Sequence, residues 1–72
     1  MAKTLNHNYQ ANIAILRENL KRGLEPSKAL DIIENWRKQF ISHNLYGEQE
    51  KEFINKCLEE VEEYTHLGVV MM

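Results

Sequence analysis

The residues best suited to metal binding are a carboxylate and an imidazole near the end of the chain. Glu63 and His66 form a Glu-x-x-His pair, the spacing with which helices supply ligands to di-iron sites. Such sites need two of these pairs and further glutamates that all point into one core. Helical spacing puts Glu63 and His66 opposite Ile54 and Val61, on a side that faces solvent. We therefore expect no bound metal and no cofactor.

No arrangement of nucleophiles and bases indicates an enzyme. His7, His43 and His66 are far apart in the sequence, and none neighbours a nucleophile. His43 falls in the last turn of a predicted helix, where a charged imidazole complements the helix dipole. Cys57 lies on an apolar stripe, which is typical of a small buried side chain. With no glycine-rich phosphate loop and no G-x-S-x-G motif, we expect a non-catalytic protein.

Helical periodicity extends over the chain, and no segment alternates as a strand does. In three segments, apolar residues recur at helical spacings, and Gly23, Pro26 and Gly47 lie at the joints between them. The pattern predicts an all-α fold in a single domain over residues 1–72. The predicted helices are at about 8–22, 26–43 and 48–67.

Residues that cap helices mark the ends of these segments. Asn6 suits the N-cap of the first helix, Glu25 followed by Pro26 suits the start of the second, and Gly68 suits the end of the third. The second helix has an apolar arc that covers about half its circumference, so we expect it to be central and to contact both neighbours. The core stripe of the third helix is expected to comprise Ile54, Cys57 or Leu58, Val61 and Tyr64.

The size of the chain predicts self-association. A domain of this length buries roughly 60% of the surface of its unfolded chain. Its core then contributes roughly 3–5 kcal/mol, and a single cysteine allows no internal disulfide. We expect a homodimer that completes the core, with residues 1–5 and 69–72 as tails that either fray or contact a partner.

Charge is unevenly distributed along the chain, whose formal net charge is −2. Residues 1–44 carry seven basic and four acidic side chains, whereas residues 45–72 carry two basic and seven acidic ones. A mildly acidic total argues against nucleic acid as a partner. One thiol, with no signal-like N-terminal segment and no apolar stretch of membrane-spanning length, predicts a cytoplasmic protein without a membrane partner.

A line of asparagines follows the first predicted helix beside its apolar stripe. Asn8, Asn12 and Asn19 share this line with Ile15 at spacings of four, three and four. Either the line is a partly buried polar seam that specifies assembly, or it is the solvated flank of the helix.

Two charged features are further candidates for partner binding. Arg37 projects within the apolar arc of the second helix, so either its stem lies along apolar surface while its head reaches water, or it meets a carboxylate across an interface. Glu59, Glu60 and Glu63 lie near the C-terminal end of the third helix, where the macrodipole disfavours negative charge. They either maintain solubility or meet a basic partner surface.

These features predict a small non-catalytic regulatory or adaptor protein that binds another protein. One alternative is a module that sequesters a small anion or nucleotide between subunits, with Tyr9, Lys21 and Arg37 lining the site. A second alternative is a weak nucleic-acid-binding domain of the helix-turn-helix type, because basic side chains gather around the glycine turn between the first two helices.

Overall fold

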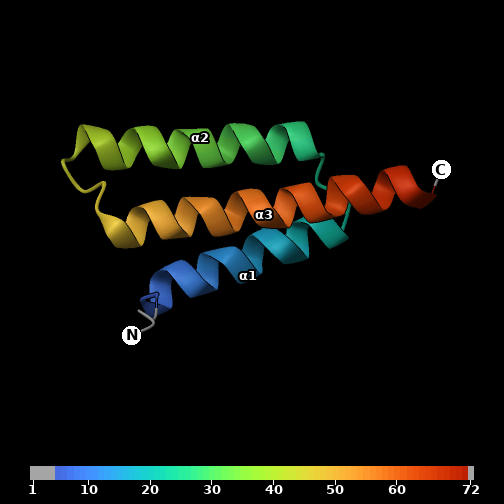
Figure 1. Cartoon of the computed structure of the whole chain (residues 1–72), viewed down its shortest axis with the longest axis horizontal. Coiled ribbons are helices and arrows are strands. Elements are labelled where there is room, and N and C mark those ends of the chain that lie inside the picture. Colours follow the sequence, from blue (N-terminus) through green and yellow to red (C-terminus); the bar gives the residue numbers. More distant parts are fainter. Residues whose placement is uncertain (1–4, 72) are drawn as a thin grey trace.

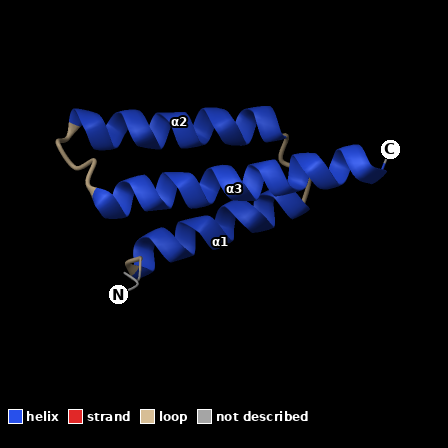
Figure 2. Cartoon of the chain, viewed as in Figure 1, coloured by secondary structure: helices blue, strands red, loops and turns tan. Residues whose placement is uncertain are grey.

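The computed structural model describes the backbone of residues 5–71 and the side chains of residues 5–65. Figures 1 and 2 show three helices joined by short turns, and no strand occurs between residues 5 and 71. The helices are α1 (His7–Lys21), α2 (Pro26–Ser42) and α3 (Glu48–Met71). The prediction of an all-α fold is confirmed, and the helix starts lie within one residue of those expected.

The predicted start residues of α1 and α2 lie where the sequence places them, although the Glu25 side chain makes no capping hydrogen bond. The Asn6 side chain accepts a hydrogen bond of 2.9 Å from the Tyr9 backbone N–H, which satisfies a donor at the start of α1. Pro26 occupies the first turn of α2, where its missing N–H costs no hydrogen bond. Gly23 and Asn44 follow the ends of α1 and α2 with φ of +113° and +60°, a conformation that these two residue types tolerate best.

The central helix is α3, and the expectation that α2 would be central is wrong. Helix α3 packs against both α1 and α2, which make few contacts with each other, and Figure 1 shows it between them. The prediction assumed that the whole apolar arc of α2 is buried. Leu30, Ile32 and Ile41 in that arc are instead 45%, 39% and 50% exposed.

The core forms where α1 and α2 meet the inner side of α3. Its most buried aromatic is Phe53, which is 1% exposed and stacks on Tyr9 with ring centroids 4.8 Å apart. Trp36 and Phe40 of α2 complete the cluster, with centroids 5.2 and 6.1 Å from that of Phe53. The buried side chains of the core are Ile13, Leu16, Leu20, Ala29, Ile33, Phe53, Ile54, Cys57 and Val61.

Helix α3 continues to Met71, so the prediction that Gly68 ends it is wrong. Glycine in a helix interior costs about 1 kcal/mol relative to alanine, which permits a helix end without enforcing one. Residues 69–71 therefore belong to α3, while residue 72 of the predicted tail lies outside the described residues. At the other end, Leu5 packs against the core, while the rest of the predicted 1–5 tail lies outside the described residues.

The thinness of the molecule explains why α2 keeps apolar side chains in solvent. Its principal-axis extents are 41 × 28 × 16 Å, and one helix with its side chains is about 10–12 Å across. Three helices in so thin an arrangement cover only the inner side of each other. Among the described residues, no helix has the length and apolarity needed to cross a membrane.

Candidate functional site

The described side chains do not assemble into a metal site. No group of three His, Cys, Asp or Glu residues within them is placed to hold a metal ion. Glu63 is exposed, and the side chain of His66 lies outside the described residues. The Nδ1 atom of His43 lies 2.9 Å from the backbone oxygen of Gln39, at the C-cap position of α2, as the capping interpretation predicts. Cys57 is fully buried, and burial raises the pKa of its thiol to about 12.

Tyr9, Lys21 and Arg37, predicted to line an anion site between subunits, are not brought together within one chain. Tyr9 points into the core and donates its hydroxyl to Glu50 of α3. Lys21 is exposed in the last turn of α1, about 18 Å along the helix from Tyr9 at 1.5 Å per residue. Arg37 lies on α2 and pairs with Glu34 of the same helix. Tyr9 and Arg37 are engaged with other side chains, and Lys21 lies far from Tyr9 along α1.

Tyr9 ties α1 to the N-terminus of α3. Its hydroxyl lies 2.6 Å from Oε2 of Glu50, whose Oε1 accepts a 2.9 Å bond from the backbone N–H of Gly47. Burial and the bond to the carboxylate raise the pKa of Tyr9 to about 12, and the same bond lowers the pKa of Glu50. The predicted ligand residue is therefore a structural tie between two helices.

Removing this tie tests its contribution to stability. We expect Tyr9→Phe to lower the free energy of unfolding by about 1 kcal/mol at neutral pH, because Glu50 loses a charge-assisted donor. A pKa raised from 10.0 to about 12 favours the protonated phenol in the folded chain. The contribution of the tyrosine is therefore complete below pH 10 and disappears as pH rises toward 12. Denaturant titration across that range measures the difference.

A double-mutant cycle provides the control for this substitution. In the Glu50→Gln background, Tyr9→Phe should cost less than in the wild type, because the charged acceptor is already gone. Equal costs in the two backgrounds would show that the hydroxyl acts through some other contact.

An open groove of about 840 Å³ lies at the surface between α1 and the first half of α3. Its charged side chains are of both signs, and some are already paired: Lys56 Nζ lies 3.7 Å from Glu52, and Arg17 binds Glu60. The groove therefore presents no concentration of one charge that would select an anion or a cation. It is lined by Leu5, Gln10, Ile13, Ala14, Arg17, Glu48, Gln49, Lys51, Glu52, Asn55 and Lys56.

Glu60, one of the three predicted acidic partner residues, is engaged within the chain. Its two oxygens accept bonds of 3.0 and 2.8 Å from Nε and Nη2 of Arg17, and this bidentate pair lowers the pKa of Glu60. Glu59 and Glu63 are exposed, as is Glu62 between them, and among the described side chains none of these three forms an ion pair. The acidic face available to a partner is thus Glu59, Glu62 and Glu63.

The asparagine line of α1 is solvated along most of its length. Asn8 and Asn19 are exposed and Asn12 is half-buried, while Ile15 between them is 57% exposed. Within one chain the line is therefore a flank in solvent and not a buried seam. Its use by a partner stays a prediction.

The largest apolar groups left in solvent on α2 share a flank with a charged pair. Leu30, Glu34, Arg37 and Ile41 follow each other at spacings of four, three and four, which places them on one side of the helix. Arg37 Nε lies 3.2 Å from Oε1 of Glu34, and a second, shorter bond joins Nη2 to Oε2. The guanidinium head of Arg37 reaches solvent, with 40% of the side chain exposed. The carboxylate that Arg37 binds belongs to Glu34 of the same helix. We call these four residues the Leu30–Ile41 flank.

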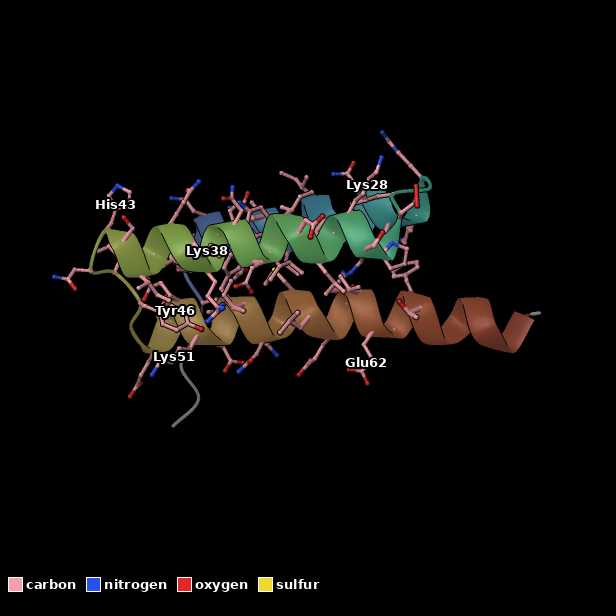
Figure 3. All side chains as sticks on the ribbon, turned by 90° about the horizontal axis from the view of Figure 1, so that it is seen from above. Lys28, Lys38, His43, Tyr46, Lys51 and Glu62 are labelled. Atoms are coloured by element: carbon pink, nitrogen blue, oxygen red, sulfur yellow. The ribbon has the colours of Figure 1, made fainter. Side chains whose placement is uncertain are left out.

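The surface beside the Leu30–Ile41 flank extends to Tyr46, which precedes α3, and to the first turns of α3. The Arg37 guanidinium interacts with Glu34 and, more weakly, with Tyr46, and both interactions raise its pKa. Lys51 lies over the Tyr46 ring, 5.8 Å from its centroid, and Figure 3 shows these two side chains close together where α3 begins. Leu58, two turns after Lys51 on the same side of α3, is 40% exposed. The Leu30–Ile41 flank is therefore bordered by polar groups and by one further apolar side chain.

Leu30 and Ile41 belong to the apolar arc of α2, which the sequence pattern predicts to be buried, so that pattern does not identify them as surface residues. The sequence does contain a signal that this side of α2 meets water: two charged residues, Glu34 and Arg37, lie on the same side of the helix as Leu30 and Ile41.

Comparisons of the chain with protein-family models, with curated proteins and with solved structures find no match. The assignment of a function therefore rests on the geometry of the chain itself.

Proposed function

We propose that this chain is a small non-catalytic adaptor or regulator that binds another protein through the Leu30–Ile41 flank. The observation that supports the proposal is the exposure of Leu30 and Ile41, 45% and 50%, on one side of a well-formed helix. The two apolar side chains lie about 16 Å apart along α2 with the Glu34–Arg37 pair between them, a mixture of apolar and charged groups found in protein-binding surfaces. Anchors that recur at these helical spacings fit a partner groove or a partner helix.

The acidic face formed by Glu59, Glu62 and Glu63 lies on α3, and Figure 3 shows Glu62 directed away from α2. The proposed binding surface on α2 therefore does not include this face, and its use by a basic partner stays a separate prediction. The reduced and buried thiol of Cys57 suits action in the cytoplasm, which we include in the proposal.

Affinity capture with matched variants tests the proposed function. The chain is immobilised as wild type, as Leu30→Asp and as Ile32→Asp; Ile32 is 39% exposed but lies on another side of α2. A captured protein is then purified and titrated against all three chains by calorimetry. We expect Leu30→Asp to weaken binding by at least about tenfold and Ile32→Asp to leave it nearly unchanged, since a charge in an apolar contact costs more than about 1.4 kcal/mol.

Two results would contradict the proposal. One is that no purified protein binds the wild-type chain directly. The other is that both aspartate variants bind as the wild type does, which would show that the Leu30–Ile41 flank is not the binding surface.

A further inference from the structure

We propose that the Leu30–Ile41 flank is self-complementary, and that two copies of the chain pair through it with their α2 helices antiparallel. The inference rests on the proposed function for the location of the binding surface, and it names a second copy of the chain as an occupant. It follows from the order of the residue types along the flank, which reads apolar, acidic, basic, apolar.

The flank is symmetric about the point midway between Glu34 and Arg37. In an antiparallel pair with its twofold axis at that point, Leu30 of one copy lies opposite Ile41 of the second, and Glu34 lies opposite Arg37. A twofold axis repeats each contact, as in any isologous interface. The pair therefore gains two apolar contacts and two contacts between opposite charges.

Other registers along the helix are mismatched. Sliding one helix by one turn in one direction puts Leu30 opposite Arg37, and sliding it in the other direction puts Glu34 opposite Ile41. Both arrangements bury a charge against an apolar side chain without a partner of opposite sign, which is costly. The sequence of the flank thus selects a single register.

Glu34 and Arg37 are free to take part in such contacts. They now pair with each other at the surface of α2, where 46% and 40% of their side chains are exposed. Approach of a second copy lets the two pairs form a network of four charges, while Leu30 and Ile41 leave water at either end. An interface formed by one helix flank from each copy buries less than about 1,200 Å² in total. The association is therefore weak and depends on concentration.

Charge reversal provides a sharp test on the full-length chain. Glu34→Arg places two arginine pairs opposite each other in a homodimer, and Arg37→Glu places glutamates opposite each other. In an equimolar mixture of the two variants, each arginine of one chain meets a glutamate of the other. The ion pair within α2 stays broken in both chains, so a repaired helix cannot account for restored association.

Analytical ultracentrifugation measures the outcome, and circular dichroism checks that both variants remain helical. For the wild type, the mass should rise from 8.5 kDa toward twice that value between about 10 µM and about 1 mM. Each variant alone should lose association by at least about tenfold, and the mixture should recover most of it, because like charges across an interface are repulsive. Leu30→Asp should abolish the dimer, and Ile32→Asp should preserve it.

The results separate this inference from the proposed function. A wild type that stays monomeric over the whole range overturns the dimer, and so does a dimer that neither charge reversal disturbs or that the mixture fails to restore. Neither result affects a second protein that binds in a Leu30-dependent manner. A dimer that behaves as expected, with no other protein bound, would support the inference and contradict the adaptor function.

Discussion

Replacing Phe53 by alanine should leave the chain largely unfolded at room temperature. Phe53 is 1% exposed and lies among the rings of Tyr9, Trp36 and Phe40, so it joins α3 to both other helices. Truncation of a buried phenylalanine to alanine costs about 3–5 kcal/mol. A single core of this size supplies about 3–5 kcal/mol in total, so the substitution removes nearly all of the stability. Far-UV circular dichroism and amide dispersion in NMR spectra measure the loss.

Two further variants keep this prediction specific to the core. Leu58→Ala lies on the same helix at a side chain that is 40% exposed, and we expect it to cost less than about 1 kcal/mol. Phe53→Leu retains much of the volume, so the chain should fold with a lower denaturation midpoint. If Phe53→Ala had the midpoint of the wild type, Phe53 would not occupy the junction of the three helices.

The helices themselves could be predicted because the forces that delimit them are local. The side chain of Asn6 reaches a backbone donor three residues away, and Pro26 restricts its own backbone. Gly23 and Asn44 tolerate positive φ whatever surrounds them. Gly68 shows the limit of this reasoning, because glycine permits a helix to end and does not require it.

The order of packing could not be predicted from the same patterns. A wide apolar arc on α2 suggested a helix with two neighbours, but the width of an arc says nothing about how many helices are present to cover it. The stripe predicted for α3 included Leu58 as an option and omitted Phe53, which precedes Ile54 by about 100° around the helix. The central helix needs a buried arc that includes Phe53, because Phe53 contacts Tyr9 of α1 as well as Trp36 and Phe40 of α2.

The contacts that occupy the candidate site residues depend on this packing order. Arg17 and Glu60 are 43 residues apart, and Tyr9 and Glu50 are 41 apart, so no spacing rule pairs them. A glutamate in a helix can reach a cation three or four residues further on, so the sequence offers both Arg37 and Lys38 to Glu34. The structure pairs Glu34 with Arg37.

Cys57 should resist thiol reagents in the folded chain and react only when the chain opens. Its side chain is fully buried, and burial raises the pKa of the thiol to about 12, so the reactive thiolate is scarce at pH 8. We expect modification by Ellman's reagent to be at least about a hundredfold slower than in the denatured chain, which corresponds to an opening free energy of about 3 kcal/mol or more.

The neighbouring position supplies a matched control for this measurement. A Cys57→Ala, Leu58→Cys chain carries its thiol at a site that is 40% exposed in the wild type, and it should react at nearly the rate of the denatured chain. Fast modification of native Cys57 would contradict the packing of α3 described above.

The pH dependence of the same reaction distinguishes a buried thiol from one that is merely slow. A thiol whose pKa rises from 9.0 to about 12 on folding stabilises the native state below pH 9, and this contribution is lost as pH increases toward 12. Above pH 9, opening therefore becomes easier, whereas thiolate formation in the opened chain is about half complete at pH 9 and about 90% complete by pH 10. The rate of modification should continue to rise from pH 9 to 11 in the wild type, while the exposed thiol of the control reaches a plateau, because of these two thiols only Cys57 must be exposed by opening before it ionises.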